Sequence, residues 1–412
     1  MTGTTDQGLF DPCPYPYYAD LRDAPVREQP GLGYVVSRYE DVVAVLRDSA
    51  TYSAAFNPGF GSSRLTLNPR PASVDAVMAE GYPECPALAH TDGATHKRHR
   101  SIVNPAFTPR RVAPLEPRIL TVSDELIDAF VGRGHVELLG EFSLPLPLKI
   151  ITEALGVPGE DLPRCKDWSE ALQGIRGREV PEDEFVQRAR KYVEFQRYFG
   201  AMANERLAEP RDDLLSDIVT AGAAGDEPLK SGELMNICAQ LLLGGNETSA
   251  STFNSGMLAL ARDDVLQRRL RERPHLIPSF VEEVLRRESP VLGIPRIATK
   301  DAKIGDVEIP AGARLFVLFG SADRDGDEFP HPDELDLERP NLRGHVAFGS
   351  GIHFCIGAPL ARAELRIGLE RLLARLATFS LAPGFEPVYV GGPMSHRLES
   401  LELVFEPAGS AA

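Results

Sequence analysis

The sequence predicts a mainly α-helical protein with a small β-rich portion. Three observations predict it: apolar residues recur at helical intervals over most of the chain after residue 95, the period shortens to that of strands in a few segments, and the composition is ordinary for a globular protein. The 412 residues are 43% hydrophobic and 25% charged. We therefore expect one large domain over residues 1–412, whose core comes mainly from helix–helix packing.

The predicted elements in the first quarter of the chain are short. Strands are expected at residues 26–28 and 34–37, and a helix at 39–46. The Pro-rich residues 12–16 predict an irregular lead-in, and the Gly-, Pro- and Ser-rich residues 57–89 predict a long irregular connection.

The rest of the chain is predicted to be helical, with an interposed β segment. Helices are expected at residues 118–131, 185–207, 232–262, 278–287 and 358–376. Strands are expected within residues 302–309, at 314–318 and, separated by loops, over 379–405. The N-terminal and C-terminal segments thus supply a small β-rich lobe beside a helix-rich body.

Charge and cysteine content exclude several classes of function. The formal net charge of −16 repels phosphates and anionic headgroups, so we expect no nucleic acid partner. The five cysteines show no paired spacing, which predicts a reducing cytoplasm rather than a disulfide framework. No signal peptide is evident, and the apolar residues 234–245 fall short of the roughly 20 that a membrane span needs. We expect a soluble cytoplasmic protein without a membrane partner.

The strongest local pattern surrounds Cys355, within residues 348–357. Its three glycines let the backbone approach a flat ligand and adopt positive φ. Cys355 precedes a predicted helix, whose free N–H groups and dipole favour a thiolate. Such a thiolate suits the axial position of haem iron, where it favours cleavage of the O–O bond. The alternative is a structural cysteine beside a tight turn.

A second pattern lies inside the helix predicted at 232–262. Gly244 and Gly245 each cost about 1 kcal/mol relative to alanine there. With Thr248, they predict a local opening that could hold dioxygen or water. Glu247 and Thr248 would supply an acid and a hydroxyl for proton delivery. The alternative is a helix that packs closely at its glycines.

The pattern Phe-Gly-x-Gly-x-His-x-Cys-x-Gly at residues 348–357 resembles the haem-binding signature of the cytochrome P-450 superfamily. Residues 244–248 resemble its oxygen-activation motif, with glycine where alanine is common. Glu283, Arg286 and Arg339 resemble a trio that holds the fold. The motifs follow the family order over most of the chain, as in soluble bacterial members. The resemblance implies the cytochrome P450 fold, with haem b between the oxygen-binding helix and the Cys-loop helix.

The resemblance also implies roles for single residues. Cys355 would be the metal ligand, and Glu247 and Thr248 would be catalytic residues that govern proton delivery. For His96 and Arg100, one turn apart, the alternative is a solvated basic face. The residues implied to contact the haem or its propionates are His96, Arg100, Gly244, Gly245, Arg296, Phe348, Gly349, His353, Cys355 and Gly357.

The substrate pocket is assigned by position. Residues 60–88 and the helices near Leu172 and Phe185 are expected to form lid elements. A mainly apolar lining suits a small or medium organic substrate, and the alternative for each lining residue is core packing. The expected lining residues are Leu243, Val291, Leu292, Ile294, Met394 and Ser395.

A basic patch on so acidic a chain predicts an electron-transfer partner. No reductase domain follows residue 412, so the resemblance implies that NAD(P)H electrons arrive through a separate ferredoxin and ferredoxin reductase. The cations expected around the thiolate side are Lys97, Arg98, Arg110, Arg111, Arg343 and Arg362.

These patterns predict a haem-thiolate monooxygenase, an oxidoreductase that uses dioxygen to insert one oxygen atom into an organic substrate, typically at a C–H bond. Two alternatives stay open. The chain could be a haem-binding sensor or binder that oxygenates nothing. The same machinery could instead perform coupling, desaturation or isomerisation.

Overall fold

The computed structural model describes residues 14–30, 32–55, 70–173, 180–224, 227–392 and 394–409. The chain divides into two compact units. The first unit comprises residues 1–52, 112–147 and 246–412, and the second comprises residues 53–111 and 148–245.

Helices dominate both units. Their bounds are α1 Tyr15–Asp23, α2 Tyr39–Arg47, α3 Ala72–Met78, α4 Gly93–Val103, α5 Pro109–Val112, α6 Glu116–Phe130, α7 Pro145–Ala154, α8 Leu162–Gln173, α9 Glu182–Ala208, α10 Leu214–Ala223, α11 Ser231–Gly244, α12 Asn246–Ala261, α13 Asp264–Glu272, α14 Ile277–Glu288, α15 Phe319–Ala322 and α16 Ala358–Arg375.

The strands are short and belong almost wholly to the first unit. Their bounds are β1 Val26–Gln29, β2 Gly33–Val36, β3 Tyr52–Ser53, β4 His135–Glu137, β5 Gly293–Ala298, β6 Ala302–Ile304, β7 Val307–Ile309, β8 Arg314–Leu318, β9 Leu376–Leu381, β10 Tyr389–Gly392, β11 Ser395–Leu398 and β12 Glu402–Pro407.

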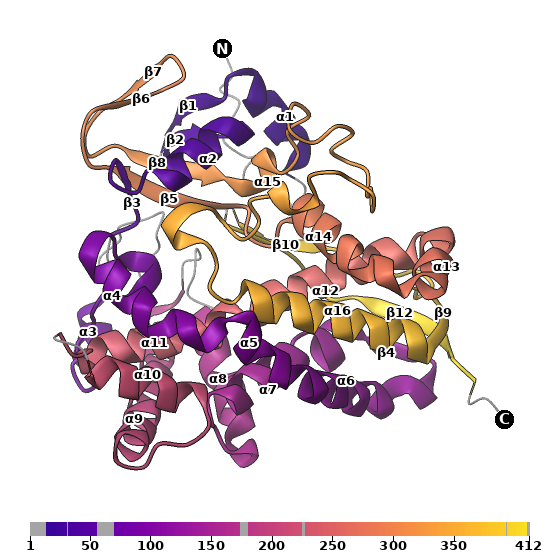
Figure 1. Ribbon diagram of the computed structural model, residues 1–412, viewed down its shortest axis with the longest axis horizontal. Helices are drawn as coiled ribbons and strands as arrows, with labels where there is room; N and C mark the ends of the chain where they lie inside the picture. The colour runs from indigo at the N-terminus through magenta and orange to yellow at the C-terminus, as the bar shows by residue number, and fades with distance from the viewer. Residues whose placement is uncertain are drawn as a thin grey trace. The chain divides into compact units, whose positions relative to one another are not determined.

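The largest sheet of the first unit has the strand order β1-β2-β8-β5-β3. Strand β8 is central: it runs parallel to β2, with Val35 opposite Phe316, and antiparallel to β5, with Arg296 opposite Leu315. The fully buried Val42 of α2 joins the core cluster of this sheet, and Figure 1 shows α2 beside the sheet. This packing fixes β5 and the segment before it.

The helical part of the first unit centres on α12, which contacts α14 and α16 (Figure 1). Phe253 of α12 is fully buried, and Asn254 accepts a hydrogen bond from Ser143 at 2.7 Å. Helix α16 also lies along α6, where Arg371 donates to Asp124 at 2.8 Å. A helix buried on most of its faces, as α12 is, packs against neighbours all round.

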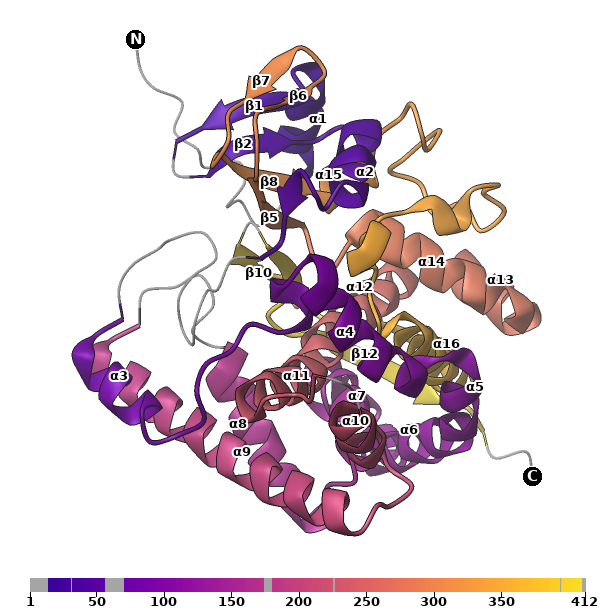
Figure 2. The same cartoon turned by 60° about the vertical axis from the view of Figure 1, so that its left-hand side comes forward.

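The second unit is built around α9, which contacts α3, α8 and α10. Figure 2 shows α3 against α9. The first turn of α9 contains three acidic residues, Glu182, Asp183 and Glu184. Their negative charges interact favourably with the positive end of the helix dipole. Its apolar face packs on α8 through aromatic rings, with the Trp168 and Phe195 centroids 5.9 Å apart.

The predicted fold class is confirmed, with four corrections to its elements. The helix expected at 232–262 is two helices that meet at Gly245. The lead-in expected at 12–16 gives way to α1 at Tyr15, since proline is tolerated in a first helical turn. The connection expected at 57–89 contains α3; residues 57–69 lie outside the described part of the chain. Strands β4 and β5 were not predicted. Among the described helices, none is both long and apolar enough to cross a membrane.

Candidate active site

Cys355 lies in a tight loop between a 3-10 turn, Gly351–His353, and α16. Its N–H donates to the carbonyl of Phe348 at 2.9 Å, and the N–H of Phe354 donates to the carbonyl of Gly351 at 3.1 Å. These bonds close the loop through its own backbone. The path of the chain at Cys355 is therefore set by the loop's own main chain.

Two glycines of this Cys loop are required by its backbone. Gly349 and Gly351 have φ values of 72° and 70°, in the left-handed region that other residues rarely adopt. A Cβ at Gly351 would lie 2.6 Å from the carbonyl oxygen of Leu46. The glycines recognised in the sequence thus serve the path of the loop and its close approach to α2.

Cys355 differs chemically from the buried cysteines. It is half-buried and precedes the first residue of α16, Ala358, where free N–H groups and the helix dipole favour an anion. Burial raises the pKa of Cys165 to about 12, and likewise that of Cys238 to about 12. Those two thiols stay protonated at neutral pH, so they are poor metal ligands and poor nucleophiles. Cys13 lies outside the described residues.

A charged network that sequence reasoning missed covers the ring of Phe348. The guanidinium carbon of Arg362 lies 4.5 Å from the ring centroid, and Arg362 donates to Glu282 at 2.6 and 2.9 Å. His345 Nε2 lies 2.9 Å from the same carboxylate. Burial alone would raise the pKa of Glu282, but the bonds from His345 and Arg362 outweigh it and hold the pKa at about 2. Glu282 is therefore ionised and orients Arg362 over the loop.

The cations expected to attract a redox partner are unequal in availability. Arg98, Arg111 and Arg362 each bind a carboxylate of their own unit at 2.5–2.6 Å. Arg343 is also paired, with its Nε 3.9 Å from Glu282 Oε1, but its side chain is 79% exposed. A long, exposed ion pair is weak, so Arg343 is the best candidate among these four. That the six cations surround the thiolate side stays a prediction.

The helix expected to open near its glycines is interrupted there. Helix α11 ends at Gly244 and α12 begins at Asn246. A Cβ added at Gly244 or Gly245 would meet no atom within 4 Å in the described part of the chain. Within the described part of the chain, close packing of a neighbour does not explain the two glycines; the expected opening stays a prediction.

Glu247 and Thr248 occupy the first turn of α12, and both are half-buried. Glu247 Oε1 lies 3.0 Å from Nε of Arg397 in β11. The hydroxyl of Thr252 donates to the carbonyl of Thr248 at 2.9 Å. The acid thus has a cationic partner that the sequence did not reveal, because Arg397 lies far along the chain in a strand without a motif.

A second carboxyl group that sequence reasoning missed lies against the same turn. Glu364 of α16 is buried, and Ser249 Oγ donates to it at 3.3 Å. Burial raises the pKa of Glu364 to about 8, and the Ser249 bond lowers it only in part. Glu364 is therefore mostly protonated at neutral pH. Its signal in the sequence is a glutamate between Leu360 and Ile367, on the buried face of α16.

Two of the segments expected to line the pocket meet in the first unit. Ser395 forms an antiparallel bridge with Val291, and the N–H of Leu292 donates to the carbonyl of Met394 at 3.2 Å. Val291, Met394 and Ser395 are each half-buried, as a lining residue would be. The structure therefore joins segments that the sequence could place only separately.

Core packing describes other expected lining residues better. Leu292 is 2% exposed and lies so close to Gly320 that a Cβ there would be 2.9 Å from its side chain. Ile294 packs against the core cluster of the five-stranded sheet, as the half-buried Val291 also does in part. Leu243, in the last turn of α11, is 8% exposed. Of these, the structure favours the core alternative for Leu292 and Ile294.

The cationic residues expected at the propionates are not on solvated faces. On α4, His96 is 4% exposed and Arg100 is half-buried. Arg296 in β5 is 5% exposed, and its Nη1 donates to the carbonyl of Pro295 at 2.9 Å. His353 is half-buried. Arginine and histidine N–H donors suit a ligand with carboxylates.

The predicted structural trio is confirmed. Arg286 binds Glu283 at 2.7 and 3.0 Å, and Arg339 binds it at 3.0 Å. The side chains of Glu283 and Arg286 are fully buried, and Arg286 also donates to the carbonyl of Asp323 at 2.9 Å. Because this charge network is fully buried, a substrate cannot reach it, and its role is to hold the fold.

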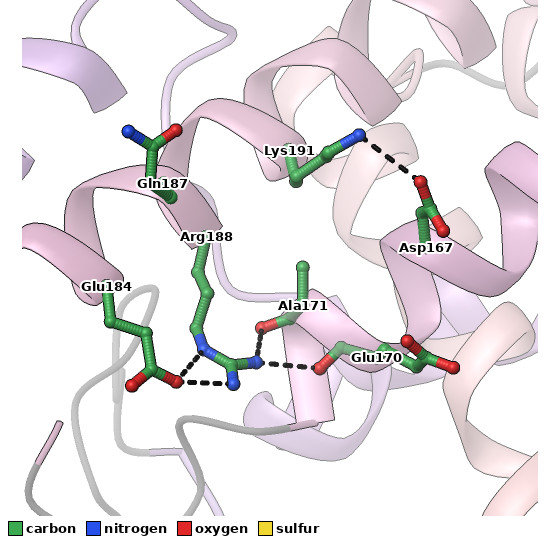
Figure 3. Close-up of a pocket in the computed structure, with 7 residues that line it drawn as sticks. All are labelled: Asp167, Glu170, Ala171, Glu184, Gln187, Arg188 and Lys191. Carbon is green, nitrogen blue, oxygen red and sulfur yellow. Dashed lines mark hydrogen bonds and ion pairs between the residues drawn. The ribbon is translucent and has the colours of Figure 1, made fainter.

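A surface pocket of about 320 Å³ lies between α8 and α9 (Figure 3). Its charged side chains satisfy one another: Arg188 donates to Glu184 at 2.6 and 2.9 Å, and Lys191 donates to Asp167 at 3.3 Å. It contains none of the expected site residues. Charges already paired leave little to bind a ligand, so this pocket is not the candidate site.

Comparison with known proteins gives the family. The cytochrome P450 family model matches residues 183–384. Cytochrome P450 107B1 of Saccharopolyspora erythraea is 37% identical over 89% of this chain and 88% of that protein. Vitamin D(3) 25-hydroxylase of Pseudonocardia autotrophica is 33% identical over 98% of each. A solved structure of cytochrome P450 CREJ in complex with (4-ethylphenyl) dihydrogen phosphate superposes with a TM-score of 0.88, at 27% identity over 96% of this chain and 98% of that one.

The chain therefore belongs to the cytochrome P450 family. It is a bacterial-type haem monooxygenase with the cytochrome P450 fold, an oxidoreductase that uses haem b, dioxygen and electrons from partner proteins.

The residues present fit this cofactor. The Cys loop offers a sulfur donor beside a helix start and is held by its backbone. Gly244 and Gly245 leave the interruption between α11 and α12 without side chains. Buried or half-buried cations at His96, Arg100 and Arg296 suit the carboxylates of a porphyrin.

Proposed function

We propose that this monooxygenase inserts one oxygen atom into a small or medium organic substrate, typically at a C–H bond, and that Cys355 would bind the iron of its haem. The carrying observation is the Cys loop: a half-buried sulfur ahead of α16, in a loop closed by the bond from Cys355 to the carbonyl of Phe348. Both alternatives, a haem binder and an enzyme of coupling, desaturation or isomerisation, are outcomes of the tests below.

The proposed cradle combines backbone and cations. Gly349 and Gly357 let the loop lie against a flat macrocycle, Phe348 flanks the sulfur, and Gly244 and Gly245 keep the opposite side free of side chains. The cations proposed to hold the propionates are His96, Arg100, Arg296 and His353. When bound, the haem supplies the redox chemistry by which dioxygen is reduced and split.

Glu247 and Thr248 are proposed to move the protons that this reduction consumes. The half-buried Glu247 can take up a proton from water. The hydroxyl of Thr248, the next residue, can donate its own proton inward and receive another, so that one proton is transferred net. The interruption of the helix at Gly245 is proposed to leave room for the water that would pass a proton from Glu247 to Thr248.

The proposed substrate pocket includes Val291, Met394 and Ser395, with Leu243 at the end of α11. One relative is named for vitamin D(3), and cytochrome P450 CREJ was solved in complex with the smaller (4-ethylphenyl) dihydrogen phosphate. Within this range we propose an organic compound that buries mostly apolar surface. The lid is proposed to include α8, α9 and the described part of residues 60–88.

The proposed electron donors are a separate ferredoxin and a ferredoxin reductase that uses NAD(P)H. The exposed Arg343 supports an acidic partner, because a surface cation steers an oppositely charged protein. The proposed location is the cytoplasm, which the four free thiols of the described cysteines support.

The experiment combines a ligand screen with turnover of Thr248→Ala. Candidate compounds are screened for the spin-state shift that accompanies displacement of iron-bound water, and the best one is used with ferredoxin and its reductase. We expect wild type to yield an oxygenated product, and Thr248→Ala to release more peroxide per NAD(P)H, by about 10-fold or more. A shift without any product indicates a binder. A product without added oxygen indicates coupling, desaturation or isomerisation. Unchanged peroxide in the variant contradicts the proton-delivery role.

A further inference from the structure

The hairpin of β10 and β11 is tied to the proposed substrate segment by its backbone. The two strands pair antiparallel. The N–H of His396 donates to the carbonyl of Pro290 at 3.3 Å, and the N–H of Leu292 donates to the carbonyl of Met394 at 3.2 Å. Movement of the residues after α14 would therefore be transmitted to this hairpin.

The ring of His396 anchors the same hairpin. It is 4% exposed, stacks on Tyr389 with the ring centroids 4.2 Å apart and the planes at 3°, and lies 3.1 Å from the hydroxyl of Tyr15 through Nδ1. Successive side chains of a strand point to opposite faces. Because the His396 side chain is buried, the next side chain, Arg397, is directed to the other face of the hairpin.

Two contacts join this hairpin to the first turns of α12. The hydroxyl of Ser251 donates to the carbonyl of His396 at 2.6 Å, and Arg397 Nε lies 3.0 Å from Glu247 Oε1. Glu247 and Ser251 stand four residues apart and share one face of the helix. His396 and Arg397, adjacent in β11, thus contact Ser251 and Glu247, which lie one turn apart on the same face of α12.

The chemistry of this ion pair restrains the acid. A guanidinium stays charged at any physiological pH and cannot pass a proton on, so the contact turns the side chain of Glu247 toward the hairpin without giving it a proton donor. The side chains of Arg397 and Glu247 are 40% and 29% exposed. Partly exposed pairs contribute little to folding, so this one can open without loss of the fold.

We propose that Arg397 is a positioning residue that restrains Glu247 until the hairpin shifts with the substrate segment, which makes proton delivery depend on occupation of the pocket. The inference rests on the role of Glu247 in the proposed function. It assigns Arg397 a function through the acid and no contact with dioxygen or haem.

The test measures how substrate-free holoenzyme divides dioxygen between two fates. With electrons from a plant-type ferredoxin and its reductase, O₂ + 2e⁻ + 2H⁺ gives H₂O₂, and O₂ + 4e⁻ + 4H⁺ gives 2H₂O. Faster proton delivery favours water. We expect Arg397→Gln to lower the peroxide formed per dioxygen consumed by about two- to fivefold, and Arg397→Lys to lie between it and wild type. Glu247→Gln should resemble wild type without substrate, because the ion pair already withholds the acid, and should raise the peroxide ratio when substrate is bound.

Additional variants separate positioning from a structural effect. Arg269, 39% exposed and paired with Glu338 at 3.1 Å, is the matched control, and Arg269→Gln should leave the ratio unchanged. The double variant Glu247→Gln/Arg397→Gln should behave as Glu247→Gln does. Ser251→Ala, which removes the bond to the hairpin but keeps the ion pair, should shift the ratio as Arg397→Gln does, and by less.

A crystal structure of Arg397→Gln supplies a readout that needs no turnover. The carboxylate of Glu247 should leave its position beside β11. If Glu247→Gln raises the peroxide ratio of the substrate-bound enzyme but Arg397→Gln leaves the substrate-free ratio unchanged or raises it, or if the carboxylate stays in place, the inference is wrong and the proposed function stands. If Glu247→Gln changes nothing when substrate is bound, the role of Glu247 in the proposed function is wrong.

Discussion

The Cys loop and the first turns of α12 hold their functional side chains in different ways. In the loop, Cys355 is fixed by main-chain bonds and by glycines with positive φ. In α12, Glu247 is fixed by the side chain of Arg397, and Ser249 contacts the buried Glu364. A backbone-fixed group has one position, whereas a group held by side chains can be released. The rigid Cys loop therefore suits a permanent metal ligand, and the first turns of α12 suit a side chain that carries protons.

The largest effect is expected from Gly351→Ala in the loop. The new Cβ would lie 2.6 Å from the carbonyl oxygen of Leu46, at a φ of 70°. We expect a loss of about 3–5 kcal/mol of unfolding free energy in urea, because strain and overpacking add. Gly384→Ala is the control: its φ is 77°, and its Cβ would meet no described atom within 4 Å, so about 1–2 kcal/mol is expected. Equal losses of unfolding free energy in the two variants would contradict this account, because the close approach of Gly351 to Leu46 would then contribute nothing.

Glu282→Gln tests the support beneath the loop. The change leaves Arg362 and His345 without their shared carboxylate, and we expect a loss of about 2–3 kcal/mol at pH 7. The folded pKa of Glu282, about 2, lies below its ordinary value of 4.5. Its contribution is therefore present above pH 4.5 and is lost as the pH falls toward 2. Urea unfolding at pH 7 and pH 4 measures it; a difference between wild type and variant that grows on acidification contradicts the assignment.

Glu364→Gln tests the side-chain-held region and has the opposite sign. The folded pKa of Glu364, about 8, lies above its ordinary value of 4.5, so its protonated form stabilises the fold below pH 4.5 and this contribution is lost as the pH rises through 8. Because glutamine never ionises, the variant should be more stable than wild type by about 3–5 kcal/mol at pH 9 and equal to it near pH 4.5. Thermal unfolding across this range measures the difference. A variant less stable at pH 9 contradicts the protonated state of Glu364.

Arg343→Ala should have the smallest effect. With 79% of its side chain exposed, it should change the unfolding free energy by less than about 0.5 kcal/mol. Reduction of the haem by ferredoxin at low salt should slow by about two- to fivefold, and the difference should vanish at high salt. Stopped-flow reduction at two ionic strengths measures it. A salt-independent effect would mean that Arg343 supports the loop rather than attracts the partner.

Local patterns made much of the fold predictable. Strand β8 was predicted with its observed bounds, Arg314–Leu318, because five consecutive residues read as a buried strand. Helix α3 was missed inside a Gly- and Pro-rich stretch, although Val74, Val77 and Met78 are spaced for one helical face. Strand β5 was missed because Pro295 interrupts it and its pairing with β8 is a tertiary contact.

The candidate site divides in the same way. Cys355 could be found from the sequence because the residues that form its loop are consecutive. The loop also needs glycine at positions where other residues would strain the backbone. Arg397 and Glu282 could not be found, because a contact between distant segments leaves no trace in spacing. Glu364 left a faint trace, a carboxyl group on a buried helical face.

The most direct measurement of the central claim is the absorption spectrum of the reduced protein with carbon monoxide. Wild type should show the red-shifted Soret band of a thiolate-ligated haem, and Cys355→Ala should lose it. Cys85→Ala, which removes another half-buried thiol, should keep it. A wild-type band typical of histidine ligation, or a red-shifted band that survives in Cys355→Ala, would contradict the account.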